Sequence, residues 1–250
     1  MAYGRSGWHI GRRMSGGDDD TGRAREAAAR AALERIEPGM TIGLGSGRAV
    51  WRLIELIGER WPRGSATPIR SAFASDRTLE LAAAQGIEAV ELDGTVRLDL
   101  AIDGADEVDP QLGLIKGGGA ALLREKLVVT AAERFLVVAE TRKRVARLGD
   151  TFKLPVEVVR FGWADTRRRL LDMLLPSAEL RGGEETPVVT DEGHYLLDCA
   201  LPPEGELDAR ALGEALKATV GVVEHGLFIG LADEALLGTP NGQVEVMQRR

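Results

Sequence analysis

Residues 98–126 read LDLAIDGADEVDPQLGLIKGGGAALLREK, and this stretch decides the fold. Its first five residues are mostly apolar, which predicts a buried strand. A lysine and three glycines stand at 116–119, and residues 120–132 have the pattern of a helix. Apolar strands followed by glycine turns and helices are typical of α/β proteins, in which ligands bind beyond the carboxyl ends of the strands.

The same alternation extends on both sides of this stretch, from residue 21 to about residue 148. We expect strands at 41–44, 69–74, 88–92, 98–102 and 135–139, and helices at 23–35, 49–61, 75–85 and 120–132. Short apolar strands alternating with helices predict a mostly parallel sheet covered on both faces. The expected fold class is therefore α/β, with a Rossmann-like, doubly wound sheet.

A different pattern begins at residue 154. Strands are expected at 155–160, 187–190, 194–199 and 222–225, and helices at 163–175 and 208–218. This βαββαβ order predicts a small α+β domain of the split-βαβ, ferredoxin-like kind. We therefore expect a disordered leader at 1–20, a catalytic α/β domain formed by 21–153 plus 228–250, and a small domain at 154–227.

Two acids, Asp103 and Asp106, directly follow the expected strand 98–102, and Gly104 and Ala105 between them permit a tight turn. Carboxylates this close repel each other when both are ionised, so one of them is expected to have a raised pKa. The alternative is a turn in which the Asp side chains accept hydrogen bonds from their own backbone. The residues alone leave both interpretations open.

Lys116 is followed by Gly117, Gly118 and Gly119, immediately before the helix. Glycines let backbone N–H groups approach a ligand closely, and a helix N-terminus attracts anions. The same N–H groups are suited to an oxyanion that develops during a reaction. A flexible connector is the alternative, and the position between strand and helix argues against it.

Glu125 is the strongest single indication of function. On a helical wheel its neighbours are apolar, namely Ala121, Val128, Val129 and Ala132. Burial disfavours a carboxylate and raises its pKa, which suits a general base. The alternative is a glutamate at the helix edge, paired with a nearby arginine such as Arg124 or Arg169.

A second glycine loop, Gly45, Ser46 and Gly47, follows the strand expected at 41–44, and Arg48 and Ala49 come next. It is neither a dinucleotide fingerprint, because the sixth position is Arg48, nor a P-loop, because no Gly-Lys-Ser/Thr follows. Such a loop between strand and helix suits a phosphate, which a guanidinium can bind with its planar fork.

The composition excludes several classes of protein. The 250 residues carry 32 basic and 39 acidic side chains, a net charge of −7, so no general affinity for nucleic acid or membrane is expected. The single cysteine, Cys199, excludes an intramolecular disulfide and a cysteine zinc site, and it fits the reducing cytoplasm. The histidines have no metal-binding spacing, and we expect neither metal nor cofactor; they are His9, His194 and His225.

Taken together, these motifs closely resemble the ribose-5-phosphate isomerase A family, from about residue 25 to residue 244. The segments that carry the resemblance are 103–107 (DGADE), 116–119 (KGGG), 124–126 (REK), 75–76 (SD), 155–158 (PVEV), 188–191 (VVTD) and 238–240 (GTP). The resemblance implies a metal-independent enzyme that opens the ring of D-ribose 5-phosphate and converts it to D-ribulose 5-phosphate through an enediolate.

The resemblance also implies residue roles. Glu125 is the expected proton-transferring base, Asp103 assists ring opening, Lys116 stabilises the enediolate oxygen and Asp106 binds a hydroxyl. The expected substrate-binding positions are Gly45, Ser46, Gly47, Arg48, Ala49, Ser75, Asp76, Gly104, Ala105, Gly117, Gly118, Gly119 and Lys143. The family implies a homo-oligomer, a dimer or tetramer, acting in the pentose phosphate pathway.

One departure concerns the phosphate loop, where the family usually has Gly-Thr-Gly-Ser-Thr and this chain has Gly-Ser-Gly-Arg-Ala at 45–49. Arg48 either replaces the hydroxyl contacts or indicates another pentose or tetrose phosphate as substrate. Two further interpretations are a non-catalytic sugar-phosphate sensor of the same fold and a nucleotide-dependent oxidoreductase. The complete acid, lysine and glycine set argues against the sensor, and the missing fingerprint argues against the oxidoreductase.

Overall fold

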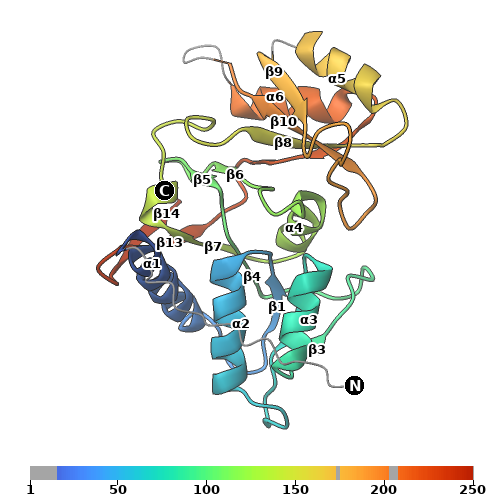
Figure 1. Cartoon of the computed structure of the whole chain (residues 1–250). Helices are drawn as coiled ribbons and strands as arrows, with labels where there is room; N and C mark the ends of the chain where they lie inside the picture. The colour runs from blue at the N-terminus through green and yellow to red at the C-terminus, as the bar shows by residue number, and fades with distance from the viewer. Residues whose placement is uncertain (1–15, 173–174, 203–207, 250) are drawn as a thin grey trace, which may run out of the picture.

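The computed structural model describes residues 16–172, 175–202 and 208–249, which contain a large sheet at one end and a smaller one at the other (Figure 1). The seven strands of the large sheet have the order β14-β13-β7-β4-β1-β2-β3. Their bounds are β1 Thr41–Leu44, β2 Arg70–Phe73, β3 Glu88–Ala89, β4 Leu100–Asp103, β7 Phe135–Glu140, β13 Glu234–Gly238 and β14 Val244–Gln248. All neighbours pair in parallel except β13 and β14.

Helices cover both faces of this sheet. One apolar cluster joins one face to α1 (Gly16–Leu33), α2 (Arg48–Arg60) and α3 (Asp76–Ala84). A second cluster joins the other face to α4 (Leu122–Thr130). Successive strand residues alternate between the two clusters, as the pleat of a strand requires. The predicted doubly wound α/β fold is confirmed, and the C-terminal tail adds the strands β13 and β14 to the sheet.

The order of the strands sets the position of the site. From β1 the chain moves outward to β2 and β3, and then it returns to place β4 on the other side of β1. The loops that follow β1 and β4 therefore leave neighbouring strands in opposite directions. Ligands of open α/β sheets bind at such a switch point.

The small sheet has the order β11-β8-β10-β9, and all its neighbours are antiparallel. Its elements are β8 Leu154–Val158, α5 Trp163–Asp172, β9 Ser177–Leu180, β10 Tyr195–Ala200, α6 Ala209–Ala218 and β11 Val222–His225. β10 lies between β8 and β9, and β8 lies between β10 and β11, so both βαβ units are split as predicted. A third apolar cluster packs this sheet against α5 and α6, and it includes the buried, free Cys199.

A third sheet, which the sequence did not predict, connects the other two. It consists of β5 (Glu107–Val108), β6 (Leu114–Ile115) and β12 (Leu227–Phe228), in the order β12-β6-β5. Each strand has only two residues, too few for a periodic pattern to be recognised. A single 3₁₀ turn, η1 (Thr141–Lys143), follows β7.

Several expected boundaries are wrong. The strand expected at 187–190 is only a bridge between Val189 and Tyr195, and the second strand of the small sheet is instead β9. The β9 residues Ser, Ala, Glu and Leu have little β-propensity, so the pattern concealed it. α1 begins at Gly16, so residues 16–20 of the expected leader are helical, while 1–15 lie outside the described residues. The domain boundaries stay a prediction. In the described ranges every helix is too short or too polar to cross a bilayer.

Candidate active site

Three charged side chains meet at the switch point, almost completely shielded from solvent. Lys116 Nζ lies 2.8 Å from Asp103 Oδ2 and 3.3 Å from Glu125 Oε2, and the three side chains are 1–3 % exposed. Lys116 Nζ also donates a hydrogen bond of 2.7 Å to the carbonyl oxygen of Gly104. The end of β4, the segment after β6 and the first turn of α4 thus converge on one ammonium group.

Asp103 is held by the loop after β1. Its Oδ1 accepts hydrogen bonds from the N–H groups of Gly104, at 2.7 Å, and of Ser46, at 3.1 Å. A Cβ on Gly45 would overlap the Asp103 carboxyl group, so a glycine is required there for this close approach. Asp103 does bond its neighbouring backbone, as the turn interpretation proposed, but its second oxygen faces Lys116.

The environment of Glu125 agrees with the helical-wheel expectation. Burial, reinforced by the negative charge of Asp103, raises the pKa of Glu125 to about 8, and burial also raises the pKa of Asp103. Burial opposes the charge of Lys116, but the two carboxylates outweigh this effect and raise the pKa of Lys116. The alternative ion pairs with Glu125 are absent among the described residues, since Arg124 pairs with Asp76. Arg169 likewise pairs with Asp165.

Asp103 Oδ2 and Glu125 Oε2 accept no hydrogen bond from the described residues, although both contact the ammonium of Lys116. A buried carboxylate oxygen without a hydrogen bond is costly, so nearly all native structures satisfy it. Glu125 lies on the wall of a pocket, where a ligand can supply the missing donor.

The glycine segment forms another wall of this pocket. Gly118 N–H donates a hydrogen bond of 2.8 Å to Asp106 Oδ2, and a Cβ on Gly118 would come within 2.7 Å of the same carboxylate. Lys143 Nζ lies 3.7 Å from Asp106 Oδ1. Gly117 has a φ of +104°, and its carbonyl accepts a 2.7 Å hydrogen bond from Arg181, which directly follows β9 of the small sheet. The segment is therefore fixed by contacts, which argues against a flexible connector.

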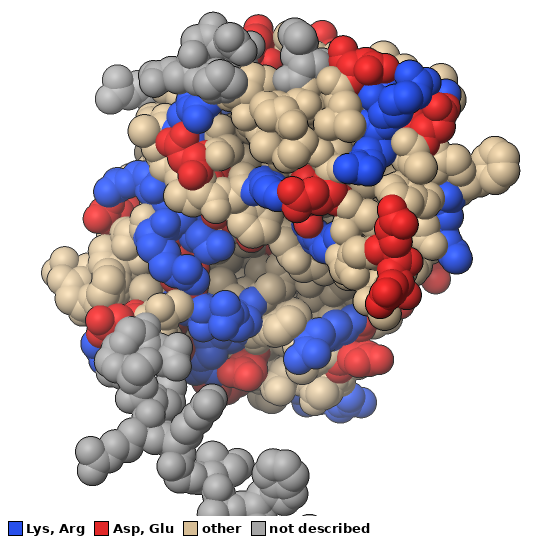
Figure 2. All heavy atoms as spheres, turned by 45° about the horizontal axis from the view of Figure 1, so that its top comes forward, with Lys and Arg blue, Asp and Glu red and all other residues tan. Residues whose placement is uncertain are grey.

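The pocket has a volume of about 140 Å³ and lies on a hollowed face with Lys and Arg side chains around it (Figure 2). Most expected site residues line it: Ser46, Gly47, Arg48, Ala49, Gly104, Ala105, Asp106, Lys116, Gly117, Gly118, Gly119, Glu125 and Lys143. Arg48 is exposed at this wall, and no hydrogen bond or ion pair joins it to another described residue. The sequence prediction missed five further lining residues, Arg25, Val50, Val138, Glu140 and Arg142.

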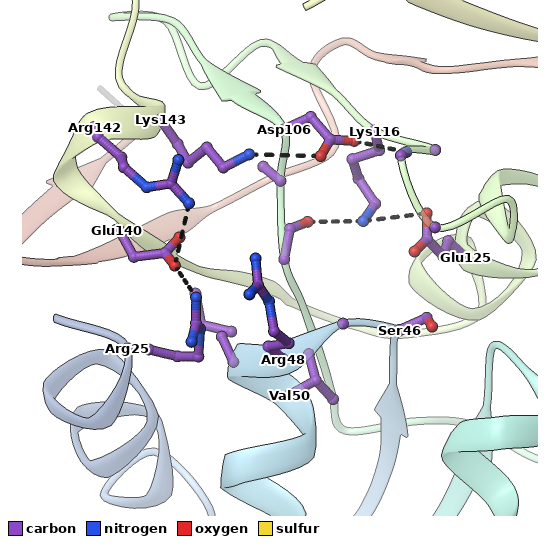
Figure 3. A pocket seen from close by; sticks show the side chains of 18 residues that line it. Arg25, Ser46, Arg48, Val50, Asp106, Lys116, Glu125, Glu140, Arg142 and Lys143 are labelled. Atoms are coloured by element: carbon purple, nitrogen blue, oxygen red, sulfur yellow. Dashed lines mark hydrogen bonds and ion pairs between the residues drawn. The ribbon is translucent and has the colours of Figure 1, made fainter. Parts of the chain in front are cut away.

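The missed charged residues form one group opposite Glu125 (Figure 3). Arg25 Nη2 of α1 lies 2.7 Å from Glu140 Oε1 at the end of β7, and Arg142 Nη2 lies 3.8 Å from the same oxygen. α1 is distant in sequence from every motif, so nothing local marks Arg25. Glu140 ends an apolar strand at the ligand-binding edge, and this position was a usable signal.

Four expected site residues lie outside the pocket wall. Gly45 and Asp103 act from behind it, as described above. Ser75 is the N-cap of α3, accepting a 3.2 Å hydrogen bond from Thr78 N–H, and it reaches the pocket only through Ser46, 3.2 Å away. Asp76 is 68 % exposed and pairs with Arg124 at 2.6 Å.

The geometry defines a class of site. A buried carboxylic acid with a pKa of about 8 is a suitable proton-transfer group, and a buried ammonium beside it stabilises negative charge. Across the pocket the guanidinium of Arg48, which pairs with no described residue, attracts an anionic substrate. The site is thus that of an acid–base enzyme for a small anionic molecule. Comparison with known proteins identifies the family. The family model of ribose 5-phosphate isomerase A (phosphoriboisomerase A) matches residues 72–242, and the chain belongs to this family.

Relatives along most of the chain agree. Over 219 residues the chain is 45 % identical to ribose-5-phosphate isomerase A of Synechococcus sp. (strain JA-3-3Ab), covering 87 % of this chain and 94 % of the relative. The protein of that name from Caulobacter vibrioides (strain NA1000 / CB15N) is 47 % identical over 221 residues, covering 86 % of this chain and 94 % of the relative.

Solved structures agree as well. A D-ribose-5-phosphate isomerase in complex with phospho-erythronic acid superposes with a TM-score of 0.85 at 35 % identity, covering 92 % of this chain and 99 % of that chain. Ribose 5-phosphate isomerase A from Methanocaldococcus jannaschii gives a TM-score of 0.83 at 32 % identity, covering 94 % of this chain and 100 % of that chain. The resemblance found in the sequence is confirmed.

Proposed function

We propose that this chain interconverts D-ribose 5-phosphate and D-ribulose 5-phosphate. The observation that carries the proposal is the buried triad, in which Lys116 lies between the carboxylates of Asp103 and Glu125, with Lys116 and Glu125 on the pocket wall and Asp103 behind it. Membership of the family supports it, and so does the complex of a similar structure with phospho-erythronic acid, a molecule that combines a phosphate with a sugar acid.

In the proposed reaction Glu125 acts as the base on the open-chain sugar. It removes the proton from C2, the C2–H electron pair forms a C1=C2 bond, and the C1 carbonyl electrons move to O1. Glu125 then returns its proton to C1, while the O2 hydroxyl proton passes to O1 and leaves a carbonyl at C2. No atom is gained or lost and no net oxidation occurs, so the reaction consumes no external oxidant or reductant.

The remaining residues are proposed to bind and stabilise. Lys116 balances the negative charge of the enediolate, an interaction that strengthens as the charge develops. Asp106, held by Gly118 N–H, accepts a hydrogen bond from a sugar hydroxyl, and Asp103 takes part in ring opening while it anchors Lys116.

The phosphate is proposed to lie at residues 46–49. Arg48 carries a charge that no described residue neutralises, next to the N-terminus of α2, and both features favour a dianion. Arg25 lies on the same wall. Arg48 therefore replaces the family's hydroxyl contacts, and we expect retained phosphate binding rather than a changed sugar.

The test is an assay of the purified protein with ribose 5-phosphate and no added cofactor, following formation of the ketose. The assay is repeated with other pentose and tetrose phosphates. Turnover fastest with ribose 5-phosphate supports the proposal. Tight binding of phospho-erythronic acid without any turnover would instead support the sensor, and a faster reaction with another phosphate would change the assigned substrate.

We also infer a cytoplasmic homodimer or tetramer in the pentose phosphate pathway. Support for self-association comes from exposed bulky apolar side chains in loops next to the small sheet. They include Phe161, between β8 and α5, which is 96 % exposed, and Val220, between α6 and β11, which is 77 % exposed. Light scattering after size-exclusion chromatography measures the assembly directly, and a monomeric mass would contradict the inference.

A further inference from the structure

β12 is an edge strand of the three-stranded sheet, and its two sides face the two elements that carry Lys116 and Glu125. On one side it pairs with β6. Directly beyond this pairing, Lys116 N–H donates a hydrogen bond of 2.9 Å to the carbonyl oxygen of Gly226. Successive backbone carbonyls of a strand point to opposite sides. The carbonyls of His225, at the end of β11, and Leu227, at the start of β12, face the other side, toward Lys126 of α4.

Lys126 of α4 occupies that other side. Its Nζ donates hydrogen bonds to the carbonyl oxygens of His225, at 2.7 Å, and Leu227, at 3.0 Å. A third hydrogen bond, of 2.8 Å, goes to Glu224 Oε1. An ammonium group has three N–H donors, and these contacts use all of them. The same Nζ lies 4.7 Å from the ring centroid of Phe228, and the side chain is only 15 % exposed.

We propose that Lys126 is a positioning residue for the reaction, and the proposal rests on the function proposed above. By binding the carbonyls of residues 225 and 227 it holds the segment 225–228 between α4 and the backbone of Lys116. Because Lys126 directly follows Glu125, this one contact sets the separation between Glu125 and Lys116.

The segment transmits this constraint because it has no room to move. A Cβ on Gly226 would overlap the carbonyl oxygen of Lys116, and Gly226 N–H donates a hydrogen bond of 2.8 Å to the carbonyl oxygen of Pro155. The ring of Phe228 contacts both ammonium groups, since Lys116 Nζ lies 5.4 Å from its centroid. Any displacement of the segment is therefore passed on to Lys116.

Glu224 supplies the negative charge beside Lys126. Although burial opposes it, the Lys126 ammonium lowers the pKa of Glu224 to about 2, and burial lowers the pKa of His225 to about 4. Near neutral pH Glu224 is charged and His225 is neutral. Lys217 also contacts Glu224, at 3.0 Å, but it binds the carbonyl of Val223 and none in 225–227.

This arrangement provides a matched pair of variants. Lys126→Met removes the bonds to residues 225 and 227, whereas Lys217→Met removes a bond to the same Glu224 and spares the segment. For Lys126→Met we expect kcat to fall roughly 10- to 100-fold, the cost of a misplaced catalytic group, with KM changed less than about threefold. Lys217→Met should keep both constants near the wild-type values.

A second readout does not depend on turnover. The pKa of Glu125 is measured by ¹³C NMR of labelled glutamate carboxyls, with the signal assigned through Glu125→Gln. Lys116 lowers this pKa by its proximity, so a looser pair in Lys126→Met should shift it upward, and Lys217→Met should leave it in place. If the wild type lacks turnover, the proposed function fails while this titration still decides the role of Lys126.

Lys126→Met with wild-type kcat and an unshifted Glu125 pKa overturns the proposal, and so does an equal loss in the two Met variants. Should Lys126→Met not fold, Lys126→Arg and Lys126→Gln decide, because both keep N–H donors. We then expect kcat in the order wild type, Arg, Gln, at constant KM. Wild-type kcat in the Gln variant would contradict the positioning role.

Discussion

Gly45 and Asp103 lie so close that residue 45 has no room for a side chain. An ideally placed Cβ on Gly45 would overlap the Asp103 carboxyl group, whose other oxygen contacts the ammonium of Lys116 at 2.8 Å. The glycine that directly follows β1 is thus part of the support for a buried ion pair at the end of β4. A loop that the sequence suggests for binding phosphate has a second role in positioning a carboxylate.

Gly45→Ala is therefore expected to displace Asp103 and loosen Lys116. Overpacking a tight site costs about 1–3 kcal/mol, so we expect a lower free energy of unfolding together with a loss of kcat. Both are measured, by urea titration and by the isomerase assay. Gly22→Ala is the control, because nothing lies within 4 Å of its added Cβ. Wild-type activity in Gly45→Ala would refute the packing argument.

Glu125→Gln is expected to reduce kcat by roughly 10²–10⁴, the contribution of one positioned base. KM should change little, because the amide preserves the shape of the side chain. The exposed Glu133→Gln, just beyond α4, is the matched control and should behave as the wild type. A Glu125→Gln protein with more than a tenth of the wild-type kcat would exclude Glu125 as the base.

The rate should depend on pH through Glu125. A base acts only when deprotonated, and burial raises the pKa of Glu125 to about 8 in the free protein. We expect kcat/KM to rise with pH and to level off above about 8, as measured with initial rates at constant ionic strength. A plateau that already begins near pH 5 would mean that another group limits the reaction.

The same shift predicts how stability depends on pH. The folded state retains the Glu125 proton up to about pH 8, whereas a glutamate in the unfolded chain has a pKa of 4.5. This group's stabilising effect is therefore complete below pH 4.5 and is lost as pH rises to about 8. Glu125→Gln removes the titration. Its Tm relative to the wild type should therefore increase between pH 5 and pH 9, measured by calorimetry. An unchanged difference across that range would contradict the raised pKa.

Arg48→Ala tests the proposed phosphate contact. A charge-assisted hydrogen bond is worth about 1.5–3 kcal/mol, so KM should rise roughly 10- to 100-fold while kcat falls much less. Arg97→Ala is the control, since Arg97 is exposed and precedes β4 at the end of the strand away from the pocket. An unchanged KM would remove Arg48 from the binding site.

Local patterns predicted much of the fold and the site correctly. The apolar run at the start of β4 and the spacing of apolar residues around Glu125 predicted a strand and a buried acid, because burial follows directly from helical or strand periodicity. The two-residue strands β5, β6 and β12 were missed because two residues show no periodicity, and β12 also pairs with a segment that is distant in the sequence. Arg25 was missed as a pocket residue because nothing near it in the sequence marks it, whereas Glu140 was missed although it ends the apolar strand β7.

The sequence by itself determined the alternating architecture, the family, and the acid, lysine and glycine set that suits proton transfer. Only the tertiary structure decided that Lys116 lies between Asp103 and Glu125, that Arg124 pairs elsewhere, and that Lys126 is bound by the strand next to Lys116. The physical reason is the distance along the sequence over which each interaction acts. Periodicity and turn chemistry act over a few neighbouring residues, whereas the distance between two buried charges depends on how whole strands and helices pack.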